Sequence, residues 1–394
     1  MVSFENLLLA ARKAQKGKRF KENTARFNLE LEKELLRLQQ ELIDRTYRPG
    51  SYKVFIVREP VKRMISAAPY RDRVVHHALC NIIEPFFERS FIHDSYANRK
   101  EKGTHKAVDR FQSYLRKYRY VLKCDIKKYF PSIDHDILYA AIEKRIADPD
   151  VLWLIQTIIE NSNQQEPVLD HYDGDNLFSP LDRRKGLPIG NLTSQFFANI
   201  YMNGFDHYIK DELGCKAYLR YVDDFAVFDD NKDRLWEIKV LMDQYLAGLR
   251  TRLHPIKTRV FTSKNGCEFL GFQLHPELRR VKQQNVDYFK LRMLRLKRRY
   301  ASGEVALEEI KRSIQGWLGH VRHANSCKLR ERLFSQMEFS KGNGPNKTTV
   351  CFAAAPGTIM RRTRVLRTGT GTLPTTGTTT SGSVWPSLST VSSA

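Results

Sequence analysis

Hydrophobic and polar residues follow two different periods along this chain. Leucines recur at helical spacing between residues 4 and 45, which predicts amphipathic helices there. Runs rich in β-branched and aromatic residues predict strands at 52–57, 118–126, 258–262 and 268–274, the last two as a pair. Helical periodicity predicts helices over 72–87, 151–159, 191–213, 234–249 and 285–339, with others that begin near Thr104 (its hydroxyl the N-cap) and Asp134. The chain is therefore expected to contain both helices and strands.

The stretch from Arg220 to Phe228 places two adjacent carboxylates between two apolar runs, which predicts a tight β-hairpin with Asp223 and Asp224 at its tip. Neighbouring side chains on a strand point to opposite faces, so one carboxylate is expected to face a site and the other to lie at its margin. Asp125 closes the strand at 118–126 and is the expected partner. Acids from neighbouring strands can bridge two Mg²⁺ ions, which predicts a site for phosphoryl transfer.

The composition of the chain indicates what kind of partner it binds. The chain has 394 residues, a net charge of +22 and a pI of about 9.7, so it is expected to attract the phosphate backbones of nucleic acids. Its six cysteines are scattered, which suits neither a zinc site nor a disulfide framework and favours a reducing compartment. We find no leader-like N-terminus and no apolar segment long enough to span a bilayer, and therefore expect a cytoplasmic protein without membrane association.

Six motifs, taken in order, resemble those of the reverse transcriptases. They lie at 61–77 and 95–105 for the fingers, at 124–130 and 221–224 for the palm, and at 254–258 and 269–272 for the later palm and the primer grip. The resemblance covers residues 50–275, with a thumb following. It implies an α+β fold, the right-hand polymerase fold, with fingers, a palm of antiparallel sheet plus helices, and a helical thumb. It also implies an RNA-directed DNA polymerase that uses two Mg²⁺ ions, a template RNA, a cDNA primer and dNTPs.

The resemblance and the change of composition together divide the chain into five regions. They are an N-terminal helical extension at 1–50, fingers at 51–120, a palm at 121–280 with a fingers insertion at about 150–190, a basic helical thumb at 281–340, and a disordered tail at 341–394. The tail is rich in Thr, Gly and Ser and contains no acidic residue. One choice of codons from Pro356 onward, read one nucleotide earlier, gives an Asn-rich run that closes on Gly-Phe-Arg-Leu. We therefore hypothesise that the tail is a retroelement template repeat read out of frame.

Matching the motifs residue by residue implies roles for the site. Asp125 and Asp223 become the main metal ligands and Asp224 a supporting one. Lys257 lies where the family has a lysine that protonates the leaving pyrophosphate, with a solvated surface lysine as the alternative. Phe130 lies where a ring excludes the ribose 2′-hydroxyl, with a core phenylalanine as the alternative. The candidates to hold the incoming triphosphate, which needs fixed positive charge, are Lys62, Arg63 and Arg71.

The segment 187–195 departs from most reverse transcriptases, which have Gln before the glycine and Pro after the serine. Here Ile189 and Gln195 take those places, a departure that resembles the reverse transcriptases of diversity-generating retroelements. Those enzymes copy a template-repeat RNA with frequent errors at adenines, and they generally work with a small basic accessory protein. Gly190 lets the backbone approach the base pair, and Ile189 is expected to contact the template base or the nucleotide. Gln195 is expected to bind the nucleotide with them. We therefore expect adenine-mutagenised cDNA that diversifies a target gene.

Three alternatives remain open. A group II intron reverse transcriptase usually adds a maturase domain, and no length for one is expected after the thumb. A retron enzyme has a compatible architecture, but Ile189 and Gln195 argue against it. A non-catalytic RNA-binding protein on a polymerase fold is the third alternative, and the intact acids Asp125, Asp223 and Asp224 argue against that.

Overall fold

The computed structural model describes residues 1–57, 63–163, 165–335, 337–341, 348–355 and 358–365. The chain forms two compact units, which are described separately below. The first unit comprises residues 1–290 and 317–326, and the second comprises 291–316 and the residues described after 326. The boundary at 290 falls inside one helix, whereas the sequence predicts a separate thumb from 281.

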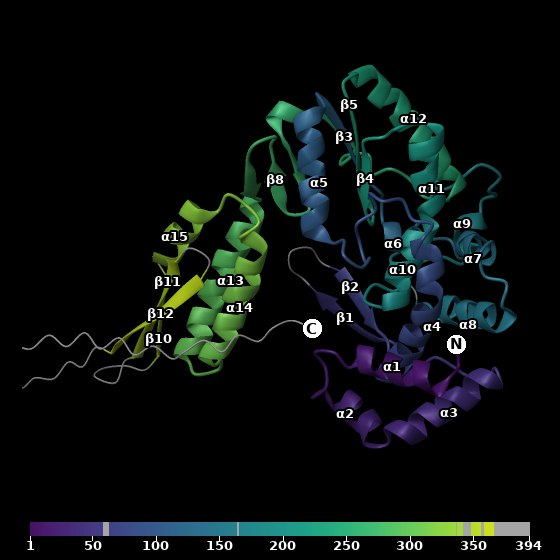
Figure 1. The fold of residues 1–394 in the computed structure, drawn as a ribbon, viewed down its shortest axis with the longest axis horizontal. Coiled ribbons are helices and arrows are strands. Elements are labelled where there is room, and N and C mark those ends of the chain that lie inside the picture. Colours follow the sequence, from purple (N-terminus) through teal and green to yellow (C-terminus); the bar gives the residue numbers. More distant parts are fainter. Residues whose placement is uncertain (58–62, 164, 336, 342–347, 356–357, 366–394) are drawn as a thin grey trace, which may run out of the picture. The chain divides into compact units, whose positions relative to one another are not determined.

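A four-stranded antiparallel sheet lies at the centre of the first unit (Figure 1). Its strands, in spatial order, are β4 (Tyr218–Tyr221), β5 (Asp224–Asp229), β3 (Tyr120–Asp125) and β6 (Arg259–Thr262). Side chains along each strand alternate between two hydrophobic cores, as the period of a strand requires. One core takes Leu122, Cys124, Phe225 and Val227, and the other takes Val121, Leu219, Ala226 and Phe228. Both faces of the sheet are therefore covered.

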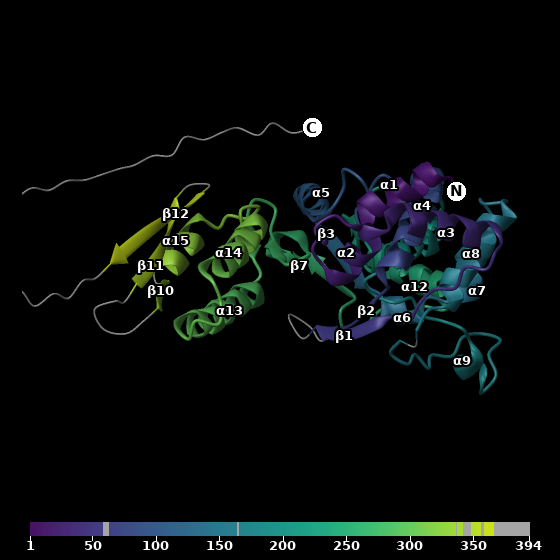
Figure 2. The ribbon, with the colours of Figure 1, turned by 90° about the horizontal axis from the view of Figure 1, so that it is seen from below.

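Different elements cover the two faces of the central sheet. The first core continues into the helices α4 (Tyr70–Glu88), α7 (His135–Glu143), α8 (Pro149–Glu160), α10 (Leu192–Tyr201), α11 (Asn203–His207) and α12 (Lys232–Gly248). The second core continues into α5 (Thr104–Lys117) and a small antiparallel sheet of β7 (Cys267–Phe269), β8 (Phe272–Leu274) and β9 (Arg279–Val281). The loop at 161–184 carries one short helix, α9 (Ser179–Asp182), and projects from the unit in Figure 2.

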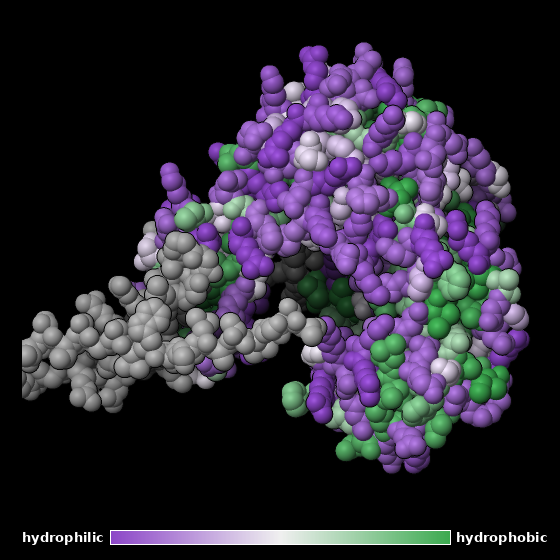
Figure 3. Space-filling view, in the orientation of Figure 1, coloured by the Kyte–Doolittle hydropathy of each residue, from purple (hydrophilic) through white to green (hydrophobic). Residues whose placement is uncertain are grey.

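Three N-terminal helices confirm the helical periodicity predicted for residues 4–45. They are α1 (Phe4–Ala14), α2 (Glu22–Leu29) and α3 (Leu31–Ile43); α1 and α2 contact α4, and α3 packs on α1 and α2 (Figure 1). Their inward faces bury apolar residues such as Leu7, Leu35 and Leu38. Hydrophobic patches also face outward in this region of Figure 3, where the large exposed apolar residues include Leu9, Leu29, Leu36 and Ile43.

Two of the predicted elements have a different structure. The strands predicted at 258–262 and 268–274 do not pair, because β6 joins the central sheet while the second segment folds back on itself. Leu270 and Gly271 have φ values of 46° and 86°, so the chain turns there between β7 and β8. The helix predicted at 191–213 is divided into α10, α11 and a π-helical turn at Tyr208–Glu212, labelled η1.

A hairpin of β1 (Lys53–Val57) and β2 (Arg63–Ala67) precedes α4. Lys62 lies outside the described residues. The loop before α10 is attached to β2 through two hydrogen bonds. Ser66 N donates to the Ile189 carbonyl at 2.9 Å, and Ala68 N donates to Asn191 Oδ1 at 3.2 Å. The segment 189–191 therefore lies along β2.

The second unit contains residues 291–301 of α13 (Gln283–Ala301), residues 307–316 of α14 (Leu307–Val321), and α15 (Cys327–Ser335). An antiparallel sheet of β10 (Glu338–Lys341), β11 (Thr348–Ala355) and β12 (Thr358–Val365) follows. The prediction of disorder from 341 onward is therefore wrong for 348–355 and 358–365, where β-branched Thr and Val residues favour strands. The rest of the tail, including most of the hypothesised template repeat, lies outside the described residues.

None of the helices in the part of the chain that the structure describes is long and apolar enough to cross a membrane.

Candidate active site

The hairpin of β4 and β5 closes through a two-residue turn. Tyr221 pairs with Asp224, so Val222 and Asp223 form the turn itself. Val222 has a φ of 58°, a left-handed conformation that is rare for a β-branched residue. Such a conformation costs about 1–2 kcal/mol, and contacts outside the turn must compensate for it. The predicted hairpin is confirmed, with Asp223 in the turn and Asp224 on the first position of β5.

The three predicted acids meet at one edge of the central sheet. Asp125, the last residue of β3, lies directly opposite Asp224 in the register of β3 and β5. Ile126 N donates to the Asp223 carbonyl at 3.3 Å, which ties the turn to the chain that follows Asp125. Acids a hundred residues apart in sequence are thus brought together by the pairing of β3 with β5.

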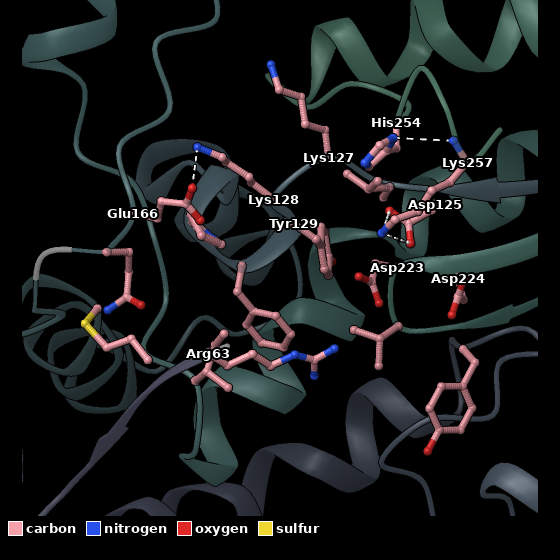
Figure 4. A pocket seen from close by; sticks show the side chains of 18 of the residues that line it. Arg63, Asp125, Lys127, Lys128, Tyr129, Glu166, Asp223, Asp224, His254 and Lys257 are labelled. Atoms are coloured by element: carbon pink, nitrogen blue, oxygen red, sulfur yellow. Dashed lines mark hydrogen bonds and ion pairs between the residues drawn. The ribbon is translucent and has the colours of Figure 1, made fainter. Parts of the chain in front are cut away.

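These acids line a cleft of about 1290 Å³ in the first unit (Figure 4). Seven of the predicted site residues line it, namely Arg63, Asp125, Phe130, Ile189, Asp223, Asp224 and Lys257. Arg63 extends from β2 toward the acids, while Lys257 reaches Asp125 from the loop before β6. The cleft therefore has carboxylates on its floor and cationic side chains around them.

Lys257 makes a close contact with one acid. Its Nζ donates to both Asp125 Oδ1 and Oδ2 at 3.0 Å, although just over half of the lysine side chain is exposed. His254 fixes the preceding loop, because His254 N donates to the Asp125 carbonyl at 2.7 Å and His254 Nδ1 accepts from Ile256 N at 3.2 Å. The ammonium group thus supplies positive charge at the Asp125 carboxylate.

The other two acids carry an electrostatic penalty. Burial raises the pKa of Asp223 to about 6, and the nearby charges of Asp224 and Asp125 add to this, while Arg63 acts in the opposite direction. Burial also raises the pKa of Asp224, against the opposing effect of Lys123, whose Nζ lies 3.5 Å from Asp224 Oδ1. Asp224 Oδ1 is buried and accepts no hydrogen bond from the described residues. Although each acid has a cation near it, burial and mutual repulsion disfavour three charged carboxylates at this edge of the sheet.

This cluster of carboxylates fits a divalent cation. The carboxylate oxygens are hard donor atoms, which suit Mg²⁺. One of them, Asp224 Oδ1, accepts no hydrogen bond from the described residues. Among the described residues, no group of three or more His, Cys, Asp or Glu side chains is already arranged as a metal centre. That finding is compatible with Mg²⁺, which usually keeps several water ligands and takes one or two carboxylates together with substrate phosphates. Asp125 and Asp223 would hold the ion, with Asp224 beside them.

Gly190 lies where the loop before α10 packs against β2. Gly190 has a φ of 120°, and a Cβ atom there would lie 2.9 Å from Ile65 Cγ2. This close approach, with the hydrogen bond from Ser66 to Ile189, fastens the loop of Ile189 to the strand of Arg63. Gly190 itself packs against β2 and does not line the cleft.

Two further predicted residues lie elsewhere. The Arg71 guanidinium pairs with Glu41 and lies over the Tyr47 ring at 5.6 Å, beside a separate depression of about 550 Å³. Gln195 lies within α10 and does not line the cleft. The expected contacts of Arg71 with a triphosphate and of Gln195 with a nucleotide are thus not supported by their positions, because α4 and α10 direct these residues to other surroundings.

Several cleft residues were not predicted from the sequence. Lys127 and Lys128 lie two and three residues after Asp125, and their place in that motif is a signal that could have identified them. Gln165 and Glu166 come from the loop at 161–184, whose sequence has no pattern that predicts its position. Lys128 Nζ pairs with Glu166 Oε1 at 2.7 Å, which draws this loop to the cleft (Figure 4).

The predicted N-cap of α5 is wrong. Gly103 occupies the cap position with a φ of 100°, and no side chain caps the helix. The Thr104 hydroxyl instead lies 2.9 Å from the Tyr221 hydroxyl, within hydrogen-bond distance. Thr104 thus contacts the residue that precedes the turn of Val222 and Asp223.

Comparison with known proteins decides the family. Residues 59–274, more than half of the chain, match the family model described as reverse transcriptase (RNA-dependent DNA polymerase). The chain belongs to the reverse transcriptase family. Its mixed helix and sheet architecture is that of a right-hand polymerase, and its family activity is RNA-directed DNA polymerisation.

The individual relatives have low sequence identity to this chain. The protein YkfC of Escherichia coli (strain K12) is 27% identical over 281 residues, which span 61% of this chain and 71% of YkfC. The group II intron-encoded protein LtrA of Lactococcus lactis is 25% identical over 181 residues, which span 45% of this chain and 28% of LtrA. Apo telomerase from Candida tropicalis, a solved structure, has a TM-score of 0.41 and 13% identity, over 58% of this chain and 48% of the telomerase chain. The chain thus matches less than a third of LtrA and about half of the telomerase.

Proposed function

We propose that this reverse transcriptase copies an RNA template into DNA at the cleft of Asp125, Asp223 and Asp224, with two Mg²⁺ ions. The observation that carries the proposal is the pairing of β3 with β5, which sets Asp125 opposite Asp224 with Asp223 in the adjoining turn. When bound, the metal ions would activate the primer 3′-hydroxyl and stabilise the leaving pyrophosphate. The template, primer and dNTPs are the proposed partners.

The surrounding residues have distinct proposed roles. Lys257, which already donates to Asp125, is positioned to give a proton to the pyrophosphate once a cation replaces it at that carboxylate. Arg63 holds the triphosphate through its guanidinium. Phe130, partly buried in the cleft wall, closes the space that a ribose 2′-hydroxyl needs.

Primer extension on an RNA template tests this function. The wild-type chain is expected to extend a DNA primer with dNTPs in Mg²⁺, and a chelator is expected to stop extension. Because the Phe130 ring excludes the 2′-hydroxyl, Phe130→Ala should reduce the preference for dNTPs over rNTPs by about tenfold or more. Extension without divalent ions, or an unchanged preference in Phe130→Ala, would contradict the assignment.

We further propose that the enzyme serves a diversity-generating retroelement, where it makes adenine-mutagenised cDNA in the cytoplasm with a small basic accessory protein. The supporting observation is Ile189, whose apolar side chain lines the cleft where the motif of most relatives carries a hydrogen-bonding Gln. A group II intron-type enzyme is the second candidate, favoured by the similarity to LtrA. The two candidates predict different error patterns.

Misincorporation opposite template adenine separates them. An apolar Ile189 offers no hydrogen bond to the base pair or the nucleotide, so base-pair geometry is checked less strictly. Ile189→Gln is therefore expected to lower misincorporation opposite adenine by about tenfold, with less change opposite the other bases. Sequencing of cDNA from both variants measures this. Equal error rates at adenine in the two variants would remove the support for the retroelement role.

A further inference from the structure

The catalytic turn is held by a buried charged group that the polymerase chemistry does not itself use. Arg220, on β4, is fully buried, with 0% of its surface exposed. A guanidinium in such a place must satisfy its N–H donors internally. It lies two residues before Val222, the strained residue of the turn, so its contacts bear directly on that turn.

Two helices fix the guanidinium. Arg220 Nε donates to Asp206 Oδ1 at 2.7 Å, and Arg220 Nη2 donates to Asp206 Oδ2 at 2.6 Å. This bidentate ion pair fixes the plane of the guanidinium. Nη1 donates to Asn199 Oδ1 at 3.2 Å. Asp206 also accepts from the Tyr218 hydroxyl at 2.7 Å, and Asn199 is itself held by donation to the Ala97 carbonyl at 2.8 Å. The guanidinium is thus anchored to α10 and α11.

One contact of the anchored group reaches the turn. Arg220 Nη1 also donates to the Val222 carbonyl at 3.1 Å. The Val222 carbonyl and the Asp223 N–H belong to one planar peptide group, so holding that carbonyl fixes the plane that leads into Asp223. The next peptide is held from the other side, because the Asp223 carbonyl accepts from Ile126 N at 3.3 Å. Both peptide planes around Asp223 are therefore fixed by groups outside the turn.

We propose that Arg220 is a positioning residue for polymerisation: it holds the strained Val222 peptide so that the Asp223 carboxylate faces Asp125 across the metal site. The inference rests on the proposed role of Asp223. A purely structural interpretation, in which Arg220 only joins β4 to α11, accounts for the Asp206 pair. It does not account for the donation to the Val222 carbonyl. The two interpretations predict different results.

The experiment compares Arg220→Lys with Arg220→Lys combined with Val222→Gly. Lysine keeps the charge beside Asp206 but lacks the planar fork that also reaches the turn. Arg220→Lys is expected to raise the Mg²⁺ concentration for half-maximal extension, and to lower kcat, by about tenfold each. Glycine adopts a positive φ without strain, so adding Val222→Gly should restore most of the lost Mg²⁺ affinity. Thermal unfolding of each variant is measured in parallel.

Arg183→Lys is the matched control. The side chain of Arg183 is also largely covered, 5% exposed, and it pairs with Asp134 and Asp175, which do not line the cleft. It is expected to lower the unfolding temperature without changing the Mg²⁺ requirement. If Arg220→Lys behaves like this control, or if Val222→Gly rescues nothing, the proposal is wrong. A wild-type chain that fails to extend primers would instead overturn the proposed function.

A second variant covers the case in which Arg220→Lys does not fold. Asn199→Ala removes one acceptor of Arg220 Nη1 and leaves the Asp206 pair intact. It is expected to raise the half-saturating Mg²⁺ concentration by a few-fold, at most about tenfold. Titration with Mn²⁺, followed by its paramagnetic resonance, reports the same change in metal affinity independently of activity. An unchanged affinity in a folded Asn199→Ala variant would contradict the proposal.

Discussion

Asp223 illustrates how one residue can serve the site at the expense of stability. Its carboxylate is buried near Asp224 and Asp125, and its pKa is raised to about 6 from an ordinary value of 3.8. The folded, metal-free chain therefore binds a proton more tightly than the unfolded chain. The contribution of Asp223 to stability is expected to fall as the pH rises from about 4 to about 6, with a total loss on the order of 3 kcal/mol.

Asp223→Asn is predicted to remove this pH dependence. In the presence of a chelator, the variant should be more stable than the wild type at pH 7 by about 1–2 kcal/mol, because the buried charge is gone. Added Mg²⁺ should raise the unfolding temperature of the wild type more than that of the variant. Denaturant unfolding from pH 4 to 8 measures both effects. A variant less stable than the wild type at pH 7 without metal would contradict the electrostatic interpretation.

At the scale of elements, the contact between β2 and the loop before α10 joins two segments that line the cleft. The Ser66 to Ile189 hydrogen bond and the close approach of Gly190 to Ile65 make the strand of Arg63 and the loop of Ile189 one structural piece. A change in this contact should therefore affect nucleotide binding as well as stability. Gly190 offers the most direct test.

Gly190→Ala is predicted to impair both properties. The new Cβ would lie 2.9 Å from Ile65 Cγ2 at a φ of 120°, so both the backbone and the packing oppose it. The expected loss of stability is about 2–3 kcal/mol, with a higher KM for dNTPs. Gly214→Ala is the matched control, since Gly214 has a φ of 64° but no atom within 4 Å of a Cβ. If both variants lose the same stability and keep the wild-type KM, the contact of Gly190 with β2 does not contribute to nucleotide binding.

The sequence predicted the elements that follow from local patterns and missed those that depend on distant contacts. The hairpin of Asp223 and the amphipathic N-terminal helices were predicted because their periodicity is local. The break of 268–274 into β7 and β8 depends on a turn at Leu270 and Gly271 that the apolar pattern conceals. Thr104 was predicted as a cap because its hydroxyl suits one, but a tertiary contact with Tyr221 uses it instead.

At the scale of the chain, a net charge of +22 contrasts with a site built on three acids. Positive surface charge attracts the phosphate backbones of template and primer, while the carboxylates repel them unless metal ions are present. The motifs predicted the three acids as site residues, together with Lys257, Phe130 and Ile189. Gln165 and Glu166 were not predicted, because their loop is held at the cleft by a tertiary contact, the ion pair between Lys128 and Glu166.

The most direct test of the central claim is single-turnover incorporation of one dNTP on an RNA template over a Mg²⁺ titration. Wild type, Asp223→Asn and Asp173→Asn are compared, the last removing an exposed acid away from the cleft. Wild type and Asp173→Asn are predicted to show the same rate and the same Mg²⁺ dependence. Asp223→Asn is predicted to be slower by a factor on the order of 10³ or more. An Asp223→Asn rate within about tenfold of the wild type would contradict the assignment of this cleft as the polymerase site.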